Sequence, residues 1–272
     1  MKYDIFLSDF DGTLVRADGK VSEQNKRAIA AYRAAGGVFV VVTGRTLTSA
    51  RSRLNELGIR EGLVVAFQGA TIADVATGKL LKDGGFSSGD ALKAIRVLES
   101  EGVHIHVYTV TDFYSNRDDE GLKIYERVCG IKAQVVDGEP ISDFAERNRL
   151  RIVKILAMVD KEERNGLNER VCAALGKGYY VTRSAEYFVE ILPEGENKGT
   201  AVDYLSEYYR VPRGRIAAIG DNYNDLPMLE RAGGKFAVAN AESPLKEIAT
   251  VVPSNEDDGV AAALKYALSE EI

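Results

Sequence analysis

DFDGT at residues 9–13 is the most informative segment of this chain, and it lies where the apolar run at residues 5–7 ends. The pattern predicts a buried strand that passes into a Gly-Thr turn. Side chains two residues apart in an extended segment point to the same side, so Asp9 and Asp11 concentrate negative charge at the carboxyl edge of a sheet. One interpretation is that this cluster binds a cation, because the concentrated negative charge requires one. The simpler interpretation is an acidic turn at the end of a strand that is only solvated.

Two later segments repeat this arrangement of an apolar strand followed by polar residues. The continuous apolar run at residues 37–42 is typical of a parallel strand covered on both faces, and it ends in Thr43-Gly44-Arg45. The run at residues 215–220 passes into a second acidic cluster, Asp221-Asn222-Tyr223-Asn224-Asp225. Both segments therefore place polar groups at strand ends.

Lys198 begins a predicted amphipathic helix, an unusual position for a structural lysine because helix N-termini favour anions. In open α/β sheets, ligands bind at the carboxyl ends of the strands, near the point where strand order reverses. Taken singly, Thr43, Lys198 and Asp221 could be turn, surface and capping residues. Their coincidence with Asp9 predicts one crevice in which all four surround a ligand.

With these motifs the chain resembles the haloacid dehalogenase-like hydrolases, and more narrowly the Cof-type phosphatases of that superfamily. The resemblance extends over the whole chain, with one departure at Gln68, where the subgroup usually has Asn; this departure concerns substrate positioning. The matching segments are DFDGT (9–13), TGR (43–45), ENKG (196–199), GDNYND (220–225), VANA (238–241) and NEDDGV (255–260).

The resemblance implies a phosphatase that forms an aspartyl-phosphate on Asp9. Asp11 would act as general acid toward the leaving oxygen and as general base for the water that cleaves the intermediate. Mg2+ would be held by the Asp9 carboxylate, the Asp11 backbone carbonyl and Asp221, and Asp225 would complete the metal shell. A carboxylate about 4 Å from a phosphate charge is repelled by about 4 kcal/mol at an effective dielectric of about 20. A divalent cation offsets this repulsion, and oxygen ligands suit Mg2+.

The remaining roles that the resemblance implies concern the phosphate group. Thr43 and the Gly44 N–H would bind phosphate oxygens, and Lys198 would neutralise the charge of the aspartate and the phosphate. Asn224 would complete the phosphate shell.

Composition places the chain among ordinary globular proteins. Its 272 residues, 45% of them apolar, suffice for one large or two modest domains. The net charge of -6 and the lack of a Lys/Arg run argue against a nucleic acid or membrane-surface partner. No apolar stretch is long enough for a bilayer and no signal-peptide pattern occurs, so the expected location is cytoplasmic. We expect a small phosphorylated metabolite as partner, and a monomer or small homo-oligomer.

The element pattern predicts an α/β fold with a doubly wound, Rossmann-like parallel sheet and an inserted α+β cap. Strands and helices alternate in the first part of the chain, the pattern becomes mixed, and the alternation returns at Lys198. We therefore predict a discontinuous hydrolase core at residues 1–82 and 193–272, and a cap at 83–192. The resemblance makes this a C2-type cap that covers the crevice and gates turnover by closing. The predicted linkers are residues 82–85 and 192–195.

Two pairs of reactive residue types lie in the cap region. His104 and His106 are two apart in a strand-like run and share a face, which we interpret as exposed; a metal pair and a substrate-facing role are the alternatives. Cys129 and Cys172 lack metal-type spacing, and we expect buried free thiols.

Sugar phosphates are the first substrate class expected, and phosphorylated cofactors the next. Tyr187, Glu190 and the strand at 108–114 are the cap residues expected to face the leaving group. A phosphomutase, which returns phosphate to the sugar, and a non-catalytic phosphate-binding protein are the alternatives. A response-regulator receiver would carry its acceptor Asp after the third strand and lack a large insertion, so the order of motifs here argues against it.

Overall fold

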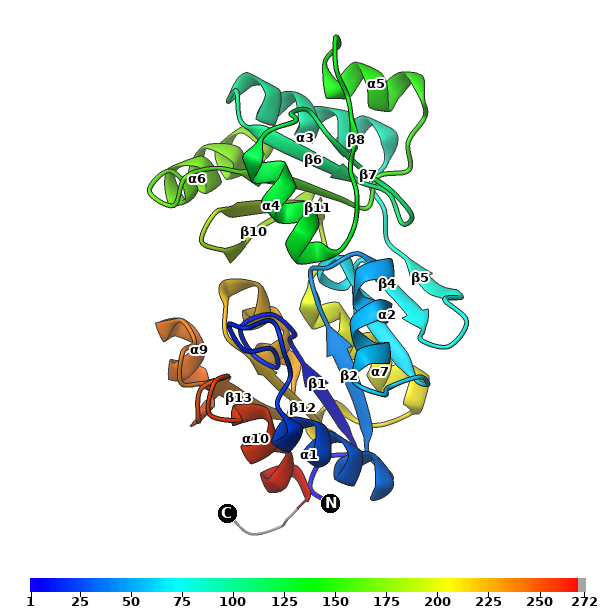
Figure 1. The fold of residues 1–272 in the computed structure, drawn as a ribbon, viewed down its shortest axis with the longest axis vertical. Coiled ribbons are helices and arrows are strands. Elements are labelled where there is room, and N and C mark those ends of the chain that lie inside the picture. The colour runs from blue at the N-terminus through cyan, green and yellow to red at the C-terminus, as the bar shows by residue number, and fades with distance from the viewer. Residues whose placement is uncertain (269–272) are drawn as a thin grey trace.

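The computed structural model describes residues 1–268, and strands from the first and last parts of that range join in its larger sheet (Figure 1). Within these residues the sheet has eight strands in the order β14-β13-β12-β1-β2-β3-β4-β5. Pairing is parallel from β14 to β3, which confirms the predicted parallel core, and antiparallel for β4 and β5. The strands are β1 (Ile5–Ser8), β2 (Val38–Val42), β3 (Leu63–Ala66), β4 (Thr71–Asp74), β5 (Leu80–Asp83), β12 (Ile216–Gly220), β13 (Gly234–Val238) and β14 (Thr250–Val252).

Helices cover both faces of this sheet, as expected for a doubly wound fold. Helices α1 and α10 pack against each other on one face, and α7 packs against α8 behind the sheet in Figure 1. Ser22 caps the N-terminus of α1, because its side-chain oxygen accepts a hydrogen bond from the Asn25 N–H at 3.0 Å. The helices are α1 (Glu23–Ala34), α2 (Leu47–Glu56), α7 (Lys198–Tyr209), α8 (Leu226–Arg231), α9 (Ser243–Ile248) and α10 (Gly259–Leu268).

The smaller sheet is mostly antiparallel and has the order β10-β11-β9-β6-β7-β8. Helices α3, α5 and α6 pack together on one face, and α4 lies on the face toward the larger sheet (Figure 1). The strands are β6 (His104–Tyr108), β7 (Phe113–Ser115), β8 (Gln134–Val135), β9 (Lys154–Met158), β10 (Tyr179–Ala185) and β11 (Phe188–Pro193). The helices are α3 (Ser88–Ser100), α4 (Glu120–Cys129), α5 (Ile141–Arg147) and α6 (Arg164–Leu175).

The chain passes between the two sheets after β5 and again after β11. Lys82 still belongs to β5, and its ammonium bonds to the Gly69 carbonyl at 2.8 Å and pairs with Glu196 beyond β11. This ion pair ties the two connections together. We propose that the sheets correspond to the two domains whose bounds the sequence predicts, with a hinge at these connections.

We call each sheet with its helices a unit, so the smaller unit is the smaller sheet with α3, α4, α5 and α6. Two expectations for the smaller unit are wrong. His104 and His106 are 5% and 0% exposed, because α4 covers their face of the sheet and the Tyr125 ring lies 4.8 Å from that of His106. Burial accordingly lowers the pKa of both imidazoles. The cysteines are free as predicted but not buried, since Cys129 is partly exposed and Cys172 exposed.

No helix among residues 1–268 is long and apolar enough to cross a membrane.

Candidate active site

Polar side chains from four elements meet at the carboxyl edge of the larger sheet. Asp9 follows β1, Thr43 follows β2, Asp221 follows β12, and Lys198 is the first residue of α7. Because parallel strands place their carboxyl ends at one edge, segments that are far apart in sequence come together there. The structure therefore brings together the residues that the motifs single out.

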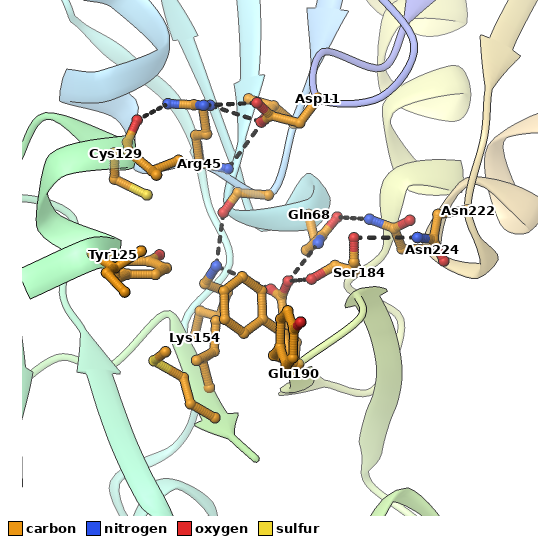
Figure 2. A pocket seen from close by; sticks show the side chains of 18 of the residues that line it. Asp11, Arg45, Gln68, Tyr125, Cys129, Lys154, Ser184, Glu190, Asn222 and Asn224 are labelled. Carbon is orange, nitrogen blue, oxygen red and sulfur yellow. Dashed lines mark hydrogen bonds and ion pairs between the residues drawn. The ribbon is translucent and has the colours of Figure 1, made fainter. Parts of the chain in front are cut away.

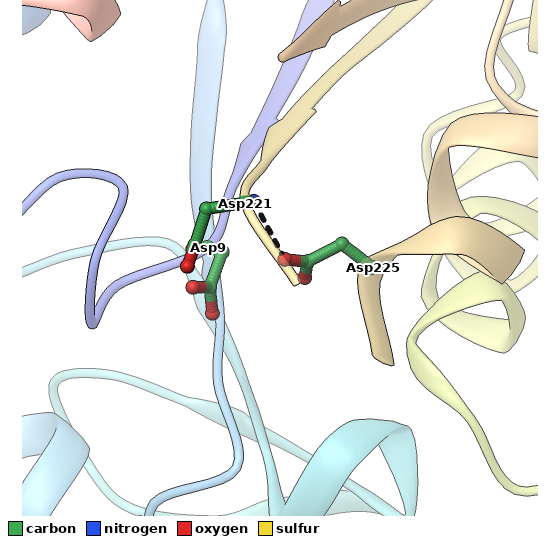
Figure 3. A group of neighbouring side chains, drawn as sticks. All are labelled: Asp9, Asp221 and Asp225. Carbon is green, nitrogen blue, oxygen red and sulfur yellow. Dashed lines mark hydrogen bonds between the residues drawn. The ribbon is translucent and has the colours of Figure 1, made fainter. Parts of the chain in front are cut away.

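Three carboxylates lie closest to one another at this edge (Figure 3). One oxygen each from Asp9, Asp221 and Asp225 falls within 4.8 Å of the others. Burial and then the charge of Asp225 raise the pKa of Asp9 well above its ordinary value, and the same causes raise the pKa of Asp221 to about 6. Carboxylate oxygens are the donors that a hard divalent cation prefers, so this group fits Mg2+.

Lys198 supplies positive charge to the same group. Its Nζ lies 2.5 Å from Asp9 Oδ1 and 2.6 Å from Asp225 Oδ1, and the side chain is 1% exposed. Burial opposes the charge, but the two carboxylates raise the pKa of Lys198 above its ordinary value. Contact with two buried carboxylates explains why a lysine occupies the start of a helix.

The Gly and Thr of the DFDGT motif position Asp221, a role that the sequence did not reveal. Thr13 Oγ1 donates to Asp221 Oδ1 at 2.6 Å. Gly12 has φ +83°, and a Cβ at that position would lie 2.6 Å from Asp221 Oδ2. Only glycine allows both this backbone conformation and the close approach. Asp225 fixes the same loop, because its Oδ2 accepts the N–H groups of Asp221 and Asn222 at 2.9 and 3.0 Å.

Arg45 holds Asp11 in a bidentate ion pair (Figure 2). Its Nε donates to Asp11 Oδ2 at 2.7 Å and its Nη2 donates to Asp11 Oδ1 at 2.6 Å. Burial opposes the guanidinium charge, but Asp11 raises the pKa of Arg45. The sequence drew attention to Arg45 only as part of the TGR motif, because its partner is 34 residues away.

The C-terminal end of helix α4, in the smaller unit, also contacts Arg45. Arg45 Nη1 donates to the Val128 carbonyl at 3.3 Å and to Ser49 Oγ at 3.1 Å, and Ser49 Oγ donates to the Cys129 carbonyl at 2.7 Å. The last carbonyls of a helix lack partners within the helix. The larger unit supplies those partners, so the same side chain contacts Asp11 and the smaller unit.

A second connection between the units passes through a buried ion pair (Figure 2). Lys154 Nζ lies 3.0 Å from Glu190 Oε2 and donates to the Gly44 carbonyl at 2.7 Å. Gln68 Nε2 donates to Glu190 Oε1 at 2.9 Å, and Asn224 Nδ2 donates to Gln68 Oε1 at 2.9 Å. Gln68, the position that departs from the Cof-type pattern, therefore joins the smaller sheet to Asn224.

A cavity of about 670 Å³ lies between the two units and reaches these groups. Asp9, Asp11, Thr43, Gly44 and Asn224 line it, whereas Lys198, Asp221 and Asp225 are not among its lining residues. Its volume is within the range of small-molecule sites, roughly 300–1,000 Å³. Tyr187 and Glu190 line it as the sequence predicted, but the predicted strand at residues 108–114 does not contribute to the lining.

Comparisons with known proteins agree with this arrangement. A model of the family described as haloacid dehalogenase-like hydrolase matches residues 6–264. The 5-amino-6-(5-phospho-D-ribitylamino)uracil phosphatase YwtE of Bacillus subtilis is 30% identical over 284 residues, which cover 96% of each chain. The HMP-PP phosphatase of Cronobacter sakazakii is 26% identical, with 86% of this chain and 83% of that protein covered. A haloacid dehalogenase-like hydrolase structure from B. subtilis superposes with a TM-score of 0.86 at 25% identity, over 97% of this chain and 99% of that one.

Proposed function

The chain belongs to the haloacid dehalogenase-like hydrolases, and on that premise we propose that it is a Mg2+-dependent phosphatase of small phosphorylated metabolites, working through an aspartyl-phosphate on Asp9. The observation that carries this proposal is the contact of Asp9 with Lys198 beside Asp221 and Asp225, at a cavity between the two units. Relatives named as phosphatases of a phosphorylated ribityl-uracil and of HMP-PP support the reaction class.

The residues that would hold Mg2+ are Asp9, Asp221 and Asp225, together with the backbone carbonyl of Asp11. When bound, the ion would neutralise charge on the carboxylates and on the substrate phosphate. Burial and the nearness of three carboxyl groups raise the pKa of Asp9 and Asp221, and a further cation at this position would favour their ionised forms.

In the first step a carboxylate oxygen of Asp9 attacks phosphorus, and the bond from phosphorus to the leaving oxygen breaks. Asp11 donates a proton to that oxygen, so the alcohol leaves neutral. Asp11 then takes a proton from water as the water attacks the phosphorus of the aspartyl-phosphate, which releases phosphate and restores Asp9. Thr43 and the Gly44 N–H bind the phosphate oxygens, assisted by Asn224, and Lys198 stabilises the charge on Asp9.

Arg45 acts in this scheme as a positioning residue for Asp11. Arg45→Lys keeps the charge but removes the bidentate geometry, and the two residues are not interchangeable at such a site. We expect kcat to fall by about 10- to 100-fold, while KM changes little. The control is Arg53→Lys, because Arg53 forms an exposed ion pair with Glu56. A kcat within twofold of the wild type, measured by steady-state kinetics, contradicts the positioning role.

Phosphate release from p-nitrophenyl phosphate tests the proposed function. We expect release with Mg2+, loss of release after chelation, and recovery when Mg2+ is restored. Release that is unaffected by chelation contradicts the metal requirement. No phosphate release from any monoester contradicts the phosphatase, and isomerised hexose phosphate without free phosphate identifies a mutase instead.

Thermal unfolding tests the metal site without relying on activity. Mg2+ at about 100 times its dissociation constant stabilises the folded state by about 2.7 kcal/mol, so the Tm of the wild type rises. Asp221→Asn removes one carboxylate, and the rise should be lost or need far more Mg2+. Asp137→Asn, at an exposed position, should keep the wild-type response. An equal rise in Tm for Asp221→Asn contradicts the site.

A further inference from the structure

We infer that the leaving group of the substrate is a flat, uncharged and largely apolar ring, held between α4 and the surface formed by β9 and β11. The inference rests on the proposed phosphatase function and names the substrate class of the same site. Sugar phosphates, the class that the sequence puts first, would be poorer substrates than phosphorylated ring compounds.

The cavity is polar at one end and apolar at the other. The polar end is formed by the groups around Asp9 and Thr43 at the edge of the larger sheet, where the phosphate group binds in the proposed function. The apolar end comes from the smaller unit and is where the leaving group must lie. Its apolar side chains are Ile124, Tyr125, Val128, Leu156, Met158 and Phe188.

One apolar wall is a surface of the smaller sheet. Alternate residues of a strand point to opposite faces, and Leu156 and Met158 of β9 line the cavity while Ile155 packs under the helices of the other face. Phe188 of β11 pairs directly with Met158, and Glu190 pairs with Leu156. Phe188, Leu156 and Met158 thus form a continuous apolar surface beside the ion pair of Glu190.

The other apolar wall is one face of α4. Gly121, Ile124, Tyr125 and Val128 are spaced so that they lie along one side of a helix, and all four line the cavity. Ile124 is 51% exposed and Val128 57% exposed, although both are large apolar residues. Exposed apolar side chains gathered at one cavity mark a binding surface rather than scattered surface residues. An apolar ring between the two walls would cover them.

Two charged side chains of this cavity wall, Lys154 and Glu190, are already occupied, and the exposed Asp160 of the lining adds only a negative charge. Lys154 and Glu190 are 2% and 3% exposed, and each contacts the other as well as at least one group of the larger unit. They offer no net charge to a leaving group. Against the apolar side chains of α4, β9 and β11, a polyhydroxylated chain would lose its water without gaining equivalent hydrogen bonds, whereas an aromatic ring packs favourably against Tyr125 and Phe188.

Competition between two substrates tests the inference. We compare 2-naphthylmethyl phosphate with glucose 6-phosphate, since both release a primary alcohol and differ mainly in the group that enters the cavity. We expect kcat/KM, measured with Mg2+ by phosphate release, to be at least about tenfold higher for the naphthyl compound. Equal or faster hydrolysis of glucose 6-phosphate, abolished by Asp9→Asn, contradicts the inference and leaves the proposed function intact.

A paired variant locates the effect on α4. Ile124→Gln/Val128→Gln changes two exposed positions, so folding should be unaffected, and it should lower kcat/KM for the naphthyl compound by at least about tenfold. Its kcat/KM for glucose 6-phosphate should fall several-fold less, because a sugar gains little from contact with an apolar wall. The matched control is Ile248→Gln/Val251→Gln, an exposed pair of the larger unit outside the cavity lining. An equal loss of kcat/KM for both substrates would contradict the assignment of α4 as a wall that contacts the ring.

Binding gives a readout that is independent of hydrolysis. The chain contains no tryptophan, so naphthalene fluorescence can be followed against a low protein background. We expect saturable binding of 2-naphthylmethyl phosphate to Asp9→Asn, weakened at least about tenfold by the added α4 changes. Failure of the wild type to hydrolyse any monoester, with saturable naphthyl binding retained, would refute the phosphatase function and leave only a ring-binding site. Absence of saturable naphthyl binding would refute the ring inference alone.

Discussion

Asp9→Asn should abolish phosphate release from p-nitrophenyl phosphate, with kcat lower by at least about 10,000-fold. The amide has nearly the same volume as the carboxylate but lacks the negative oxygen that attacks phosphorus. Asp9 is 5% exposed and lies against Lys198, and an amide still accepts a hydrogen bond from the ammonium, so the fold should persist. Steady-state kinetics with Mg2+, together with a Tm measurement, provides the test.

Asp11→Asn is the control within the same motif. A nitrophenolate is a good leaving group and needs little protonation, so formation of the intermediate should be affected less than its hydrolysis. We therefore expect Asp11→Asn to retain an initial burst of nitrophenol that Asp9→Asn lacks. Equal steady-state rates for Asp9→Asn and wild type contradict the assignment of Asp9 as nucleophile.

Lys198→Met should be the most destabilising single change at the site. It leaves Asp9 and Asp225 buried without their shared cation, and breaking a buried pair in this way costs about 3–5 kcal/mol. Urea unfolding without Mg2+ should show a lower midpoint with an unchanged slope. The variant should also lose activity, because the charge next to the nucleophile is gone.

Lys26→Met is the matched control for that substitution. Lys26 pairs with Glu23 on the solvent-exposed side of α1, and exposed pairs contribute about 0–1 kcal/mol. A midpoint for Lys198→Met no lower than that of Lys26→Met would show that the buried pair does not stabilise the fold.

The convergence of Asp9, Thr43, Lys198 and Asp221 could be predicted because each lies at a strand end or at the start of a helix. Parallel strands bring such positions to one edge whatever the surrounding loops do. Helix α5 was not predicted, because its seven residues are too few to show a clear period. The segment at residues 108–114 was predicted as a strand, but it contains the connection between β6 and β7, which pair as a hairpin.

Contacts that depend on how the two units meet could not be predicted. The alternation in β6 correctly placed His104 and His106 on one face, but no local pattern shows that α4 covers that face. The pairing of Lys154 with Glu190 joins neighbouring strands whose order follows from the folded sheet. Arg45 likewise meets Asp11 only through tertiary packing.

Trapping the intermediate tests the central claim most directly. Borohydride reduces an aspartyl-phosphate to homoserine, and peptide mass spectrometry identifies the residue that has changed. After the enzyme is quenched during turnover of p-nitrophenyl phosphate with Mg2+, we predict homoserine in place of Asp9, and none without substrate. Reduction at Asp11 or Asp221 instead, or no reduction during rapid burst-phase turnover, would contradict a phosphoryl group carried by Asp9.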